Sequence, residues 1–214
     1  MKKLFFLVTF AIALFVSEKA QAQLNIHVGY APEFFATNDV TNGDTTFFFN
    51  GIYVGLNWKF NVSNKINLTA GAQFRMNLRD DAEHTLSLNG NYFIHHTSRE
   101  RQTLIDIPIL LNYDIALNRK VTLSPFIGPT LSWGLNGNTT EELLWPYNEK
   151  YHYNWYGEEG ERNRFNVYGT AGIKVSFYRF TISGGFRYGF LDLNKNNDII
   201  TKTYGFFLSF GHDV

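Results

Sequence analysis

The sequence predicts an all-β protein, an eight-stranded antiparallel up-and-down transmembrane β-barrel preceded by a cleavable signal peptide. The first observation is a period-two alternation of apolar and polar residues, which indicates strands with one apolar and one polar face. The second is the length of these stretches, because a tilted strand that crosses a bilayer needs roughly 9–11 residues. The third is composition: aromatic residues make up 17% of the chain and Cys is absent, as expected for a barrel with aromatic girdles and no disulfides.

The first 22 residues have the pattern of a secretory signal peptide. The lysine pair Lys2-Lys3 precedes an apolar stretch, and the small residues of a cleavage site end at Ala22. A membrane anchor is the alternative, but the apolar stretch is shorter than the roughly 20 residues of a spanning helix. We therefore expect a signal peptide at 1–22 and one outer-membrane β-barrel domain at 23–214.

The first three predicted strands follow the cleavage site. In the first, Ile26 and Val28 alternate with His27 and Gly29, and the next two strands repeat the pattern. Segments rich in Asn, Asp, Ser and Gly separate them, as is typical of turns and loops. These strands span 24–35, 46–60 and 66–78.

The fourth and fifth predicted strands form the clearest hairpin of the chain. Ile105, Ile107 and Ile109 lie on one face of the fourth strand, and Asp106 lies on the other. A polar turn at 118–120 leads into the fifth strand, which alternates in the same way. The two strands span 104–117 and 121–135.

The last three predicted strands span 165–177, 179–190 and 200–211. Along the whole chain, short turns alternate with longer polar segments, which an outer-membrane barrel places at the periplasm and outside the cell, respectively. An even number of strands returns both chain ends to the periplasmic side. The segments expected as loops are 37–45, 79–103, 136–164 and 194–198.

A soluble lipocalin-like barrel is the alternative fold, because it also has eight antiparallel strands. It needs its apolar face inside and its polar face outside, and alternation alone does not assign the faces. Glycine, asparagine and charged residues share one face here, which fits a narrow interior that the large residues of the other face would overfill. The membrane barrel is therefore the preferred interpretation.

The central hairpin also carries a family resemblance. The chain resembles the PorT-like outer-membrane β-barrel family at 105–113, IDIPILLNY, and at 125–131, PFIGPTL. In that family an acidic-Ile-Pro-aliphatic strand precedes a strand that begins Pro-aromatic and reaches Gly-Pro. The resemblance implies the barrel fold and, for some members, a part in protein secretion, although such families are defined more by architecture than by activity.

The last predicted strand carries a second pattern. Residues 203–210 have the polar-x-Gly-x-x-apolar-x-aromatic order that resembles the β-signal read by the barrel-assembly machinery. The chain departs from that signal because it continues through 211–214 beyond the aromatic Phe210. We therefore expect outer-membrane lipid and, through this strand, the barrel-assembly machinery as partners.

Charged residues of both signs lie on the predicted inner face. Charges in a narrow lumen must be paired, because burying an unpaired charge is costly. The preferred hypothesis is a salt-bridged plug, since the interior of an eight-stranded barrel is just wide enough for side chains to fill. The alternative is a gate whose pairs exchange partners to open a small channel. The candidate lumen charge network is Glu33, Arg75, Asp106, Asp114, Lys174 and Arg187, of which Glu33, Arg75, Asp106 and Arg187 are expected at comparable depth.

The longest predicted loop, 136–164, combines aromatic rings with glutamates. Flat rings beside carboxylates suit stacking on sugars or contacts with an extracellular protein. The alternative is that the rings cap the barrel mouth. The candidate binding residues are Trp145, Tyr147, Tyr151, Tyr153, Trp155 and Tyr156.

The sequence predicts no catalytic residue, no metal site and no cofactor. His84, His95 and His96 share a polar segment with Asp80 and Asp81, but a solvated loop is preferred over a protease-like Asp/His site. Nucleophile elbows, phosphate loops and metal-spaced clusters do not occur in the sequence. A formal net charge of zero gives no basic footprint for nucleic acid.

These observations predict a non-enzymatic integral outer-membrane β-barrel protein. We expect it to bind an extracellular protein or glycan, or to support the cell envelope, with a largely plugged lumen. The alternatives are a small gated, porin-like channel and a PorT-like component of protein secretion.

Overall fold

Strands account for most of the chain that the computed structural model describes, which comprises residues 23–39, 43–84, 95–143, 149–157, 160–195 and 199–214. The predicted signal peptide at 1–22 lies outside these ranges. Within them, no helix is long and apolar enough to cross a membrane. The strands are β1 (Gln23–Tyr30), β2 (Glu33–Asp39), β3 (Gly43–Asn61), β4 (Ile66–His84), β5 (His95–Tyr113), β6 (Ile115–Ala116), β7 (Val121–Leu143), β8 (Glu149–Asn154), β9 (Phe165–Phe177), β10 (Phe180–Gly189) and β11 (Ile199–Asp213).

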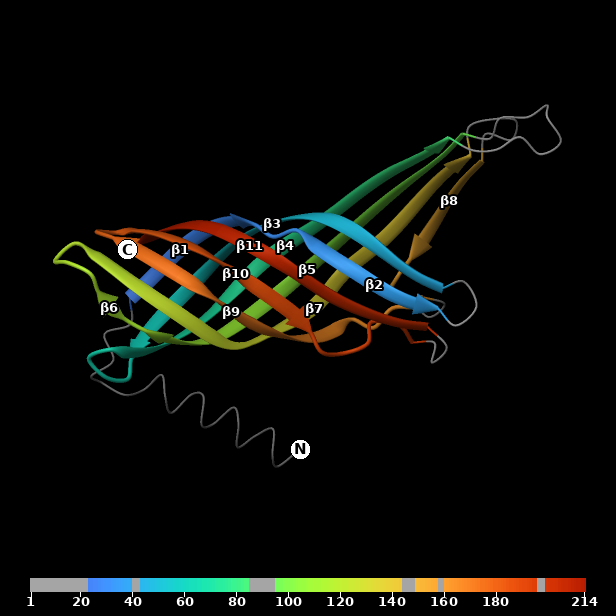
Figure 1. Cartoon of the computed structure of the whole chain (residues 1–214). Coiled ribbons are helices and arrows are strands. Elements are labelled where there is room, and N and C mark those ends of the chain that lie inside the picture. Colours follow the sequence, from blue (N-terminus) through green and yellow to red (C-terminus); the bar gives the residue numbers. More distant parts are fainter. Residues whose placement is uncertain (1–22, 40–42, 85–94, 144–148, 158–159, 196–198) are drawn as a thin grey trace.

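These segments close into one antiparallel ring of eight strands (Figure 1). β1 and β2 together form one strand of the ring, interrupted at Ala31 and Pro32, and both pair with β3 on one side and β11 on the other. β6 continues β5 along β7, and β8 is an additional strand beside β7. The remaining neighbours follow chain order, so the predicted up-and-down barrel is confirmed.

The apolar faces of the strands point outward and the polar faces point into the lumen. In β3, Ile52, Val54 and Leu56 are exposed, whereas Tyr53 and Gly55 between them are buried. A soluble protein buries its apolar side chains and leaves most charged ones exposed. The lipocalin-like alternative is therefore wrong, because the large exposed residues need lipid around them.

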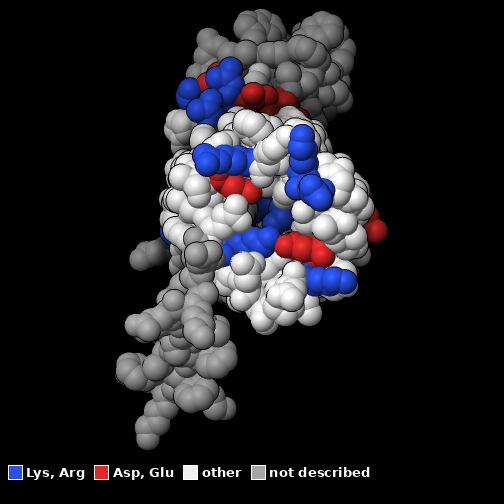
Figure 2. All heavy atoms as spheres, turned by 90° about the vertical axis from the view of Figure 1, so that its left-hand side faces the viewer, with Lys and Arg blue, Asp and Glu red and all other residues white. Residues whose placement is uncertain are grey.

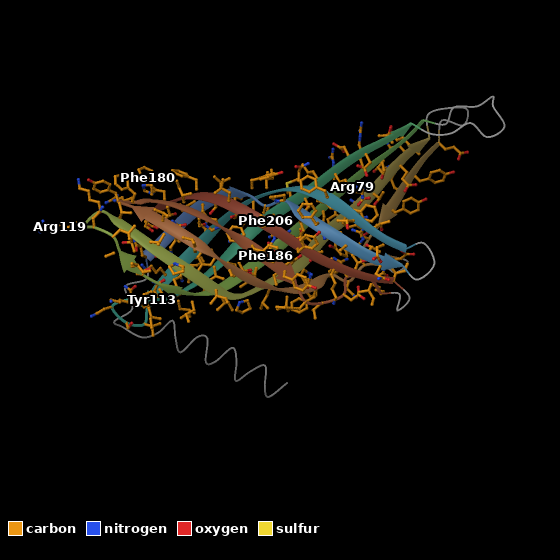
Figure 3. The ribbon with its side chains drawn as sticks, in the orientation of Figure 1. Arg79, Tyr113, Arg119, Phe180, Phe186 and Phe206 are labelled. Carbon is orange, nitrogen blue, oxygen red and sulfur yellow. The ribbon has the colours of Figure 1, made fainter. Side chains whose placement is uncertain are left out.

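Exposed aromatic side chains extend along this lipid-facing band. Figure 3 labels Tyr113 and Phe180 near the short-turn end and Phe186 and Phe206 nearer the middle of the barrel. All four side chains are exposed. Tyrosine and phenylalanine at the rims and apolar residues between them are typical of transmembrane barrels.

Two segments expected as loops contain long stretches of strand. β4 continues to His84 and β5 begins at His95, so the prediction of a loop over 79–103 is wrong at both ends. β7 continues to Leu143 and pairs with β8, so 136–164 is not a plain loop either. Beyond the lipid both faces of a strand are polar, and pairing continues there without the alternation on which the prediction rested.

The extended strands form a sheet that projects beyond the rest of the barrel, at the upper right of Figure 1. We call this sheet the tongue; it consists of β8 with residues 79–84 of β4, 95–103 of β5 and 136–143 of β7. The short turns lie at the opposite end of the barrel, where Asn25 pairs with Asp213 near the ends of β1 and β11. The tongue is thus on the side of the long connections, which in an outer-membrane barrel is outside the cell.

Candidate functional site

Four charged side chains meet inside the lumen, and we call them the charge quartet: Glu33, Arg75, Asp106 and Arg187. Arg75 on β4 donates from Nη1 to Glu33 Oε2 at 2.5 Å and from Nε to Asp106 Oδ2 at 2.8 Å. Glu33 and Arg75 are fully buried, and Asp106 is 1% exposed. Two carboxylates balance two guanidinium groups, which a low-dielectric interior requires.

Neutral side chains occupy further hydrogen-bonding positions around the carboxylates of the quartet. Tyr168 on β9 donates its hydroxyl to Glu33 Oε1 at 2.8 Å, and Asn77 donates its amide to Glu33 Oε2 at 2.7 Å. Ser132 on β7 donates to Asp106 Oδ1 at 2.6 Å. The bond between Tyr168 and Glu33 joins β9 to β2, which are not neighbours in the ring. The lumen is therefore crossed by a hydrogen-bonded network rather than by a single pair.

Arg187 is held less tightly than Arg75. Its Nη1 lies 3.6 Å from Asp106 Oδ2 and its Nη2 lies 3.9 Å from Glu33 Oε2. Nη2 also donates to the backbone oxygen of Ala31 at 3.4 Å. The Nε atom of Arg187 is buried and has no hydrogen-bond partner among the described residues.

The break between β1 and β2 brings Glu33 into the lumen. A Cβ atom on Gly51 would lie 2.1 Å from the backbone oxygen of Ala31, and one on Gly205 would lie 2.3 Å from that of Pro32. These two glycines therefore let the neighbouring strands approach the break closely. Pro32 has no N–H to donate, which interrupts the ladder at this point.

The other two candidate lumen charges lie closer to the short turns and do not join the quartet. Asp114 accepts hydrogen bonds from Lys59 Nζ at 2.7 Å and from Ser124 Oγ at 2.6 Å. Lys174 on β9 makes neither an ion pair nor a hydrogen bond with a side chain in the described ranges. Of the six predicted lumen charges, four thus form the quartet, and Asp114 and Lys174 lie apart from it, nearer the short turns.

Trp155 and Tyr156 cap the lumen at the long-connection end, and we call them the lid. Trp155 Nε1 donates to Thr139 Oγ1 at 2.6 Å, and Gln102 Nε2 donates to the Tyr156 hydroxyl at 2.7 Å. These bonds hold both rings beneath the base of the tongue. The lid belongs to an apolar cluster of Phe35, Phe49, Trp155, Tyr156 and Leu193.

The remaining aromatic candidates are not part of the lid. Tyr151 and Tyr153 lie on β8 of the tongue and are exposed. Trp145 and Tyr147 lie outside the described residues. Of the four candidates that the structure describes, two therefore close the barrel mouth and two face solvent.

A groove of about 1020 Å³ lies between the tongue and the lid. On its floor, the guanidinium carbon of Arg162 lies 3.8 Å from the ring centroid of Trp155, and Arg162 Nη2 lies 4.0 Å from Glu100 Oε2. The groove is open to solvent above Tyr153, whose side chain is 51% exposed. The lining residues are Glu100, Thr139, Glu141, His152, Tyr153, Asn154, Trp155, Gly157, Gly160, Glu161 and Arg162.

Burial shifts the protonation equilibria of the groove floor, which lies beyond the lipid-facing band. Burial raises the pKa of the Glu100 carboxyl above its usual value, and the charges of Arg162 and Arg79 only partly oppose this shift. Burial also lowers the pKa of Arg162, although Glu100 opposes it. Glu100 therefore takes up a proton at a higher pH than an exposed glutamate does.

Sequence reasoning missed several residues of these sites, among them Asn77, Tyr168 and Arg162. Asn77 and Tyr168 lie on the predicted polar faces of their strands, and this placement was the only indication that they face the lumen. Their bonds to Glu33 depend on closure of the ring, which the local pattern does not specify. Arg162 lies in a segment expected as a loop and gave no signal of its own.

Two histidines of the tongue lie opposite one another in neighbouring strands. The pairing of β4 with β5 places the backbone of His84 opposite that of His95. Among the described residues, no group of three or more His, Cys, Asp or Glu side chains is arranged to hold a metal ion.

Comparison with known proteins gives one family match. The family model described as outer membrane protein beta-barrel domain matches residues 19–195. No curated protein sequence matches the chain.

Several solved structures are similar to this barrel. One is Ail, the attachment invasion locus protein of Yersinia pestis, in complex with the heparin analogue sucrose octasulfate. Its sequence is 15% identical; the comparison covers 90% of this chain and 99% of that chain, with a TM-score of 0.46. Neisserial surface protein A is 11% identical, with coverage of 87% and 96% and a TM-score of 0.38. The outer membrane protease OmpT from Escherichia coli is 10% identical, with coverage of 92% and 97% and a TM-score of 0.46. Likenesses at this level transfer no function.

Proposed function

Because the chain belongs to the outer membrane protein beta-barrel domain family and is located in the outer membrane, we propose that it is a non-enzymatic surface-binding barrel. In this proposal the lumen is plugged, and an extracellular protein binds in the groove between the tongue and the lid. The observation that carries the proposal is the groove itself, which has a volume of about 1020 Å³ and lies outside the lipid-facing band.

The lumen supports this proposal because two barriers cross it. The charge quartet joins β2, β4, β5 and β10 with side chains that are at most 7% exposed. The lid closes the outer end with Trp155 and Tyr156. Opening the quartet would leave buried charges unpaired, at a cost of roughly 3–5 kcal/mol. A closed lumen leaves the outer surface as the place where this barrel meets a partner.

The charge of the groove favours a cationic partner. Glu100, Glu141 and Glu161 contribute three carboxylates to its lining, against the guanidinium groups of Arg162 in the lining and of Arg79, which lies 3.3 Å from Glu100. Complementary charge increases the rate of association and selects among partners. The exposed ring of Tyr153 adds a flat surface of the kind enriched at protein interfaces.

The free edge of β8 supports an extended partner. The amide of Trp155 donates to the oxygen of Gly137 at 2.8 Å, and hydrogen-bonded positions alternate along an antiparallel pair. The backbone groups of Lys150, His152 and Asn154 therefore point away from β7. Within the described ranges no strand pairs with this edge. An extended peptide can bind such an edge as an added strand.

A peptide-binding assay tests the proposal. The probe is a fluorescent peptide of alternating lysine and threonine residues, and the readout is its anisotropy with the folded barrel in detergent. Replacing Glu100, Glu141 and Glu161 with glutamine should weaken binding by about tenfold or more, as expected for loss of charge-assisted contacts. The control is Glu142→Gln, because Glu142 pairs with Lys150 on the opposite face of the tongue. Equal loss in both variants, or no binding to the native barrel, would contradict the proposal.

A gated channel is the second candidate function, and the loose hold on Arg187 favours it. Its guanidinium group lies 3.6 and 3.9 Å from the two carboxylates, so an exchange of partners requires little displacement. Planar-bilayer recording of the native barrel, Arg75→Ala and Arg187→Ala tests this function. Discrete conductance that changes in these variants would favour the channel over the plugged binder.

A PorT-like part in secretion rests on the central hairpin. The acidic residue of the motif is Asp106, a member of the quartet. Gly128 of the second motif strand faces the backbone of β5, and a Cβ atom on Gly128 would lie 2.1 Å from the backbone oxygen of Ile109. The motif therefore has a structural explanation that does not require secretion. Loss of secreted cargo on deletion of the gene would favour the secretion role.

The C-terminal strand is proposed as the segment that the barrel-assembly machinery reads. Residues 203–210 lie within β11, paired with β10 on one side and with β1 and β2 on the other. Replacing Phe210 with serine should reduce the amount of barrel in the outer membrane, measured as the heat-modifiable fraction. Unchanged assembly would remove this proposal without affecting the groove.

A further inference from the structure

The lumen between the charge quartet and the short turns contains a chamber. Two cavities of about 70 and 210 Å³ adjoin, because they share several lining residues, among them His27, Asn57, Thr69, Lys174, Ser183 and Ser209. Figure 2 looks onto the short-turn end and shows Lys or Arg atoms inside the opening. In an outer-membrane barrel this end faces the periplasm, so small molecules in the periplasm reach the chamber directly.

Lys174 provides a positive charge in the chamber that no carboxylate of the described residues contacts. It lines both cavities, and no described side chain lies within ion-pair or hydrogen-bond distance of its amine. Asp114 is bonded to Lys59 at 2.7 Å, and Asp213 accepts a hydrogen bond from Asn25 at 2.8 Å. The nearby carboxylates are therefore occupied by other partners, and the ammonium group is free to bind an anion.

Arg187 provides a second positive group at the ceiling of the chamber. It lines the upper cavity and is 6% exposed, and its Nε has no acceptor in the described part of the chain. Arg75 makes the short bonds to Glu33 and Asp106, so the hydrogen-bonding capacity of Arg187 is only partly used. A buried polar atom without a partner is uncommon in folded proteins, and a bound water or ion can satisfy it.

An apolar wall faces these charges. Phe126 and Phe207 pack together with their ring centroids 6.1 Å apart, and both line the upper cavity with Leu110 and Pro108. A pocket with an apolar wall and a few placed polar groups is typical of sites for small organic molecules. The wall excludes a purely inorganic ion as the best fit, because it would leave this surface uncovered.

We propose that the chamber binds a small organic monocarboxylate from the periplasm. The carboxylate accepts hydrogen bonds from Lys174 Nζ, and the apolar body lies against Phe126 and Phe207 beneath Arg187. This site is independent of the outer groove, since the quartet separates the two.

Titration with para-fluorobenzoate tests the proposal, with ¹⁹F line width measured against the detergent-folded barrel and against detergent alone. Lys174→Met should weaken binding by about tenfold or more, because a charge-assisted hydrogen bond is lost. Lys174→Arg should retain most of the affinity, and para-fluorobenzamide, which carries no charge, should not bind saturably. Heat-modifiable mobility of each variant establishes that its barrel is folded.

Lys202→Met is the matched control, because Lys202 Nζ donates to the backbone oxygen of Phe190 away from the chamber. This variant removes the same charge and should bind the probe like the native barrel. Saturable binding that Lys174→Met leaves unchanged would overturn the proposal. An absence of saturable binding to the native barrel would overturn it as well, and neither result would bear on peptide binding in the outer groove.

Discussion

Replacing Arg75 with methionine is the most informative perturbation of the lumen. Arg75 is fully buried and bonds two carboxylates at 2.5 and 2.8 Å. Methionine fills much of the same volume, but Glu33 and Asp106 then share only Arg187, which lies 3.6 Å or farther from them. One buried negative charge is left uncompensated, and breaking such a pair costs roughly 3–5 kcal/mol of unfolding free energy.

Urea unfolding in lipid vesicles measures this cost, followed by tryptophan fluorescence and by gel mobility without heating. The matched control is Arg101→Met, because Arg101 is exposed on the tongue. Its substitution should change the unfolding free energy by less than about 0.5 kcal/mol. Adding Asp106→Asn to Arg75→Met restores charge balance and should recover at least about 1 kcal/mol through coupling of contacting residues. If Arg75→Met destabilises the barrel no more than Arg101→Met does, the quartet does not hold the lumen together.

Three further predictions concern the strand break, the groove and the lid. Gly51→Val should prevent assembly of the heat-modifiable barrel, because a Cβ atom there would lie 2.1 Å from the backbone oxygen of Ala31; normal assembly would contradict the close approach. Burial raises the pKa of the Glu100 carboxyl above its usual value of 4.5. The folded tongue therefore binds the carboxyl proton more tightly than the unfolded chain does. The stability of the tongue should fall as pH rises through the raised pKa. Hydrogen exchange of β8 should show this dependence, and Glu100→Gln should lack it. Trp155→Ala removes the ring whose centroid lies 6.1 Å from that of Phe49, so it should lower the unfolding free energy by about 3–5 kcal/mol in the urea assay used for Arg75. The control is Tyr153→Ala, which removes an exposed ring and should have little effect.

The barrel, its strand number and the direction of its faces could all be predicted from the sequence. Period-two alternation over stretches such as 104–117 and 121–135 is a local property, because each side chain's face depends only on its position along the strand. The strand 165–177 agrees residue for residue with β9. Tyr178, the single residue left between the predicted strands 165–177 and 179–190, has a positive φ of 54°, as expected for a tight turn.

The sequence did not determine where the strands end outside the membrane. The tongue has polar residues on both faces, so its strands carry no alternation, and only pairing between β4, β5, β7 and β8 reveals them. The sequence also did not show which aromatic residues of 136–164 are buried and which are exposed. Trp155 and Tyr156 enter the lid while Tyr151 and Tyr153 stay exposed, because β8 ends between the two pairs.

Which lumen charges meet depends on how the strands assemble into the ring. Six charges were predicted for the lumen network from the sequence, but the depth of each depends on the stagger of the strands and on the break at Ala31 and Pro32. Closure of the ring brings Glu33 to Arg75 and leaves Lys174 without a partner in the described chain. The face of a residue is a local property of its strand, whereas its depth in the lumen and its neighbours across the barrel arise only when all the strands pair.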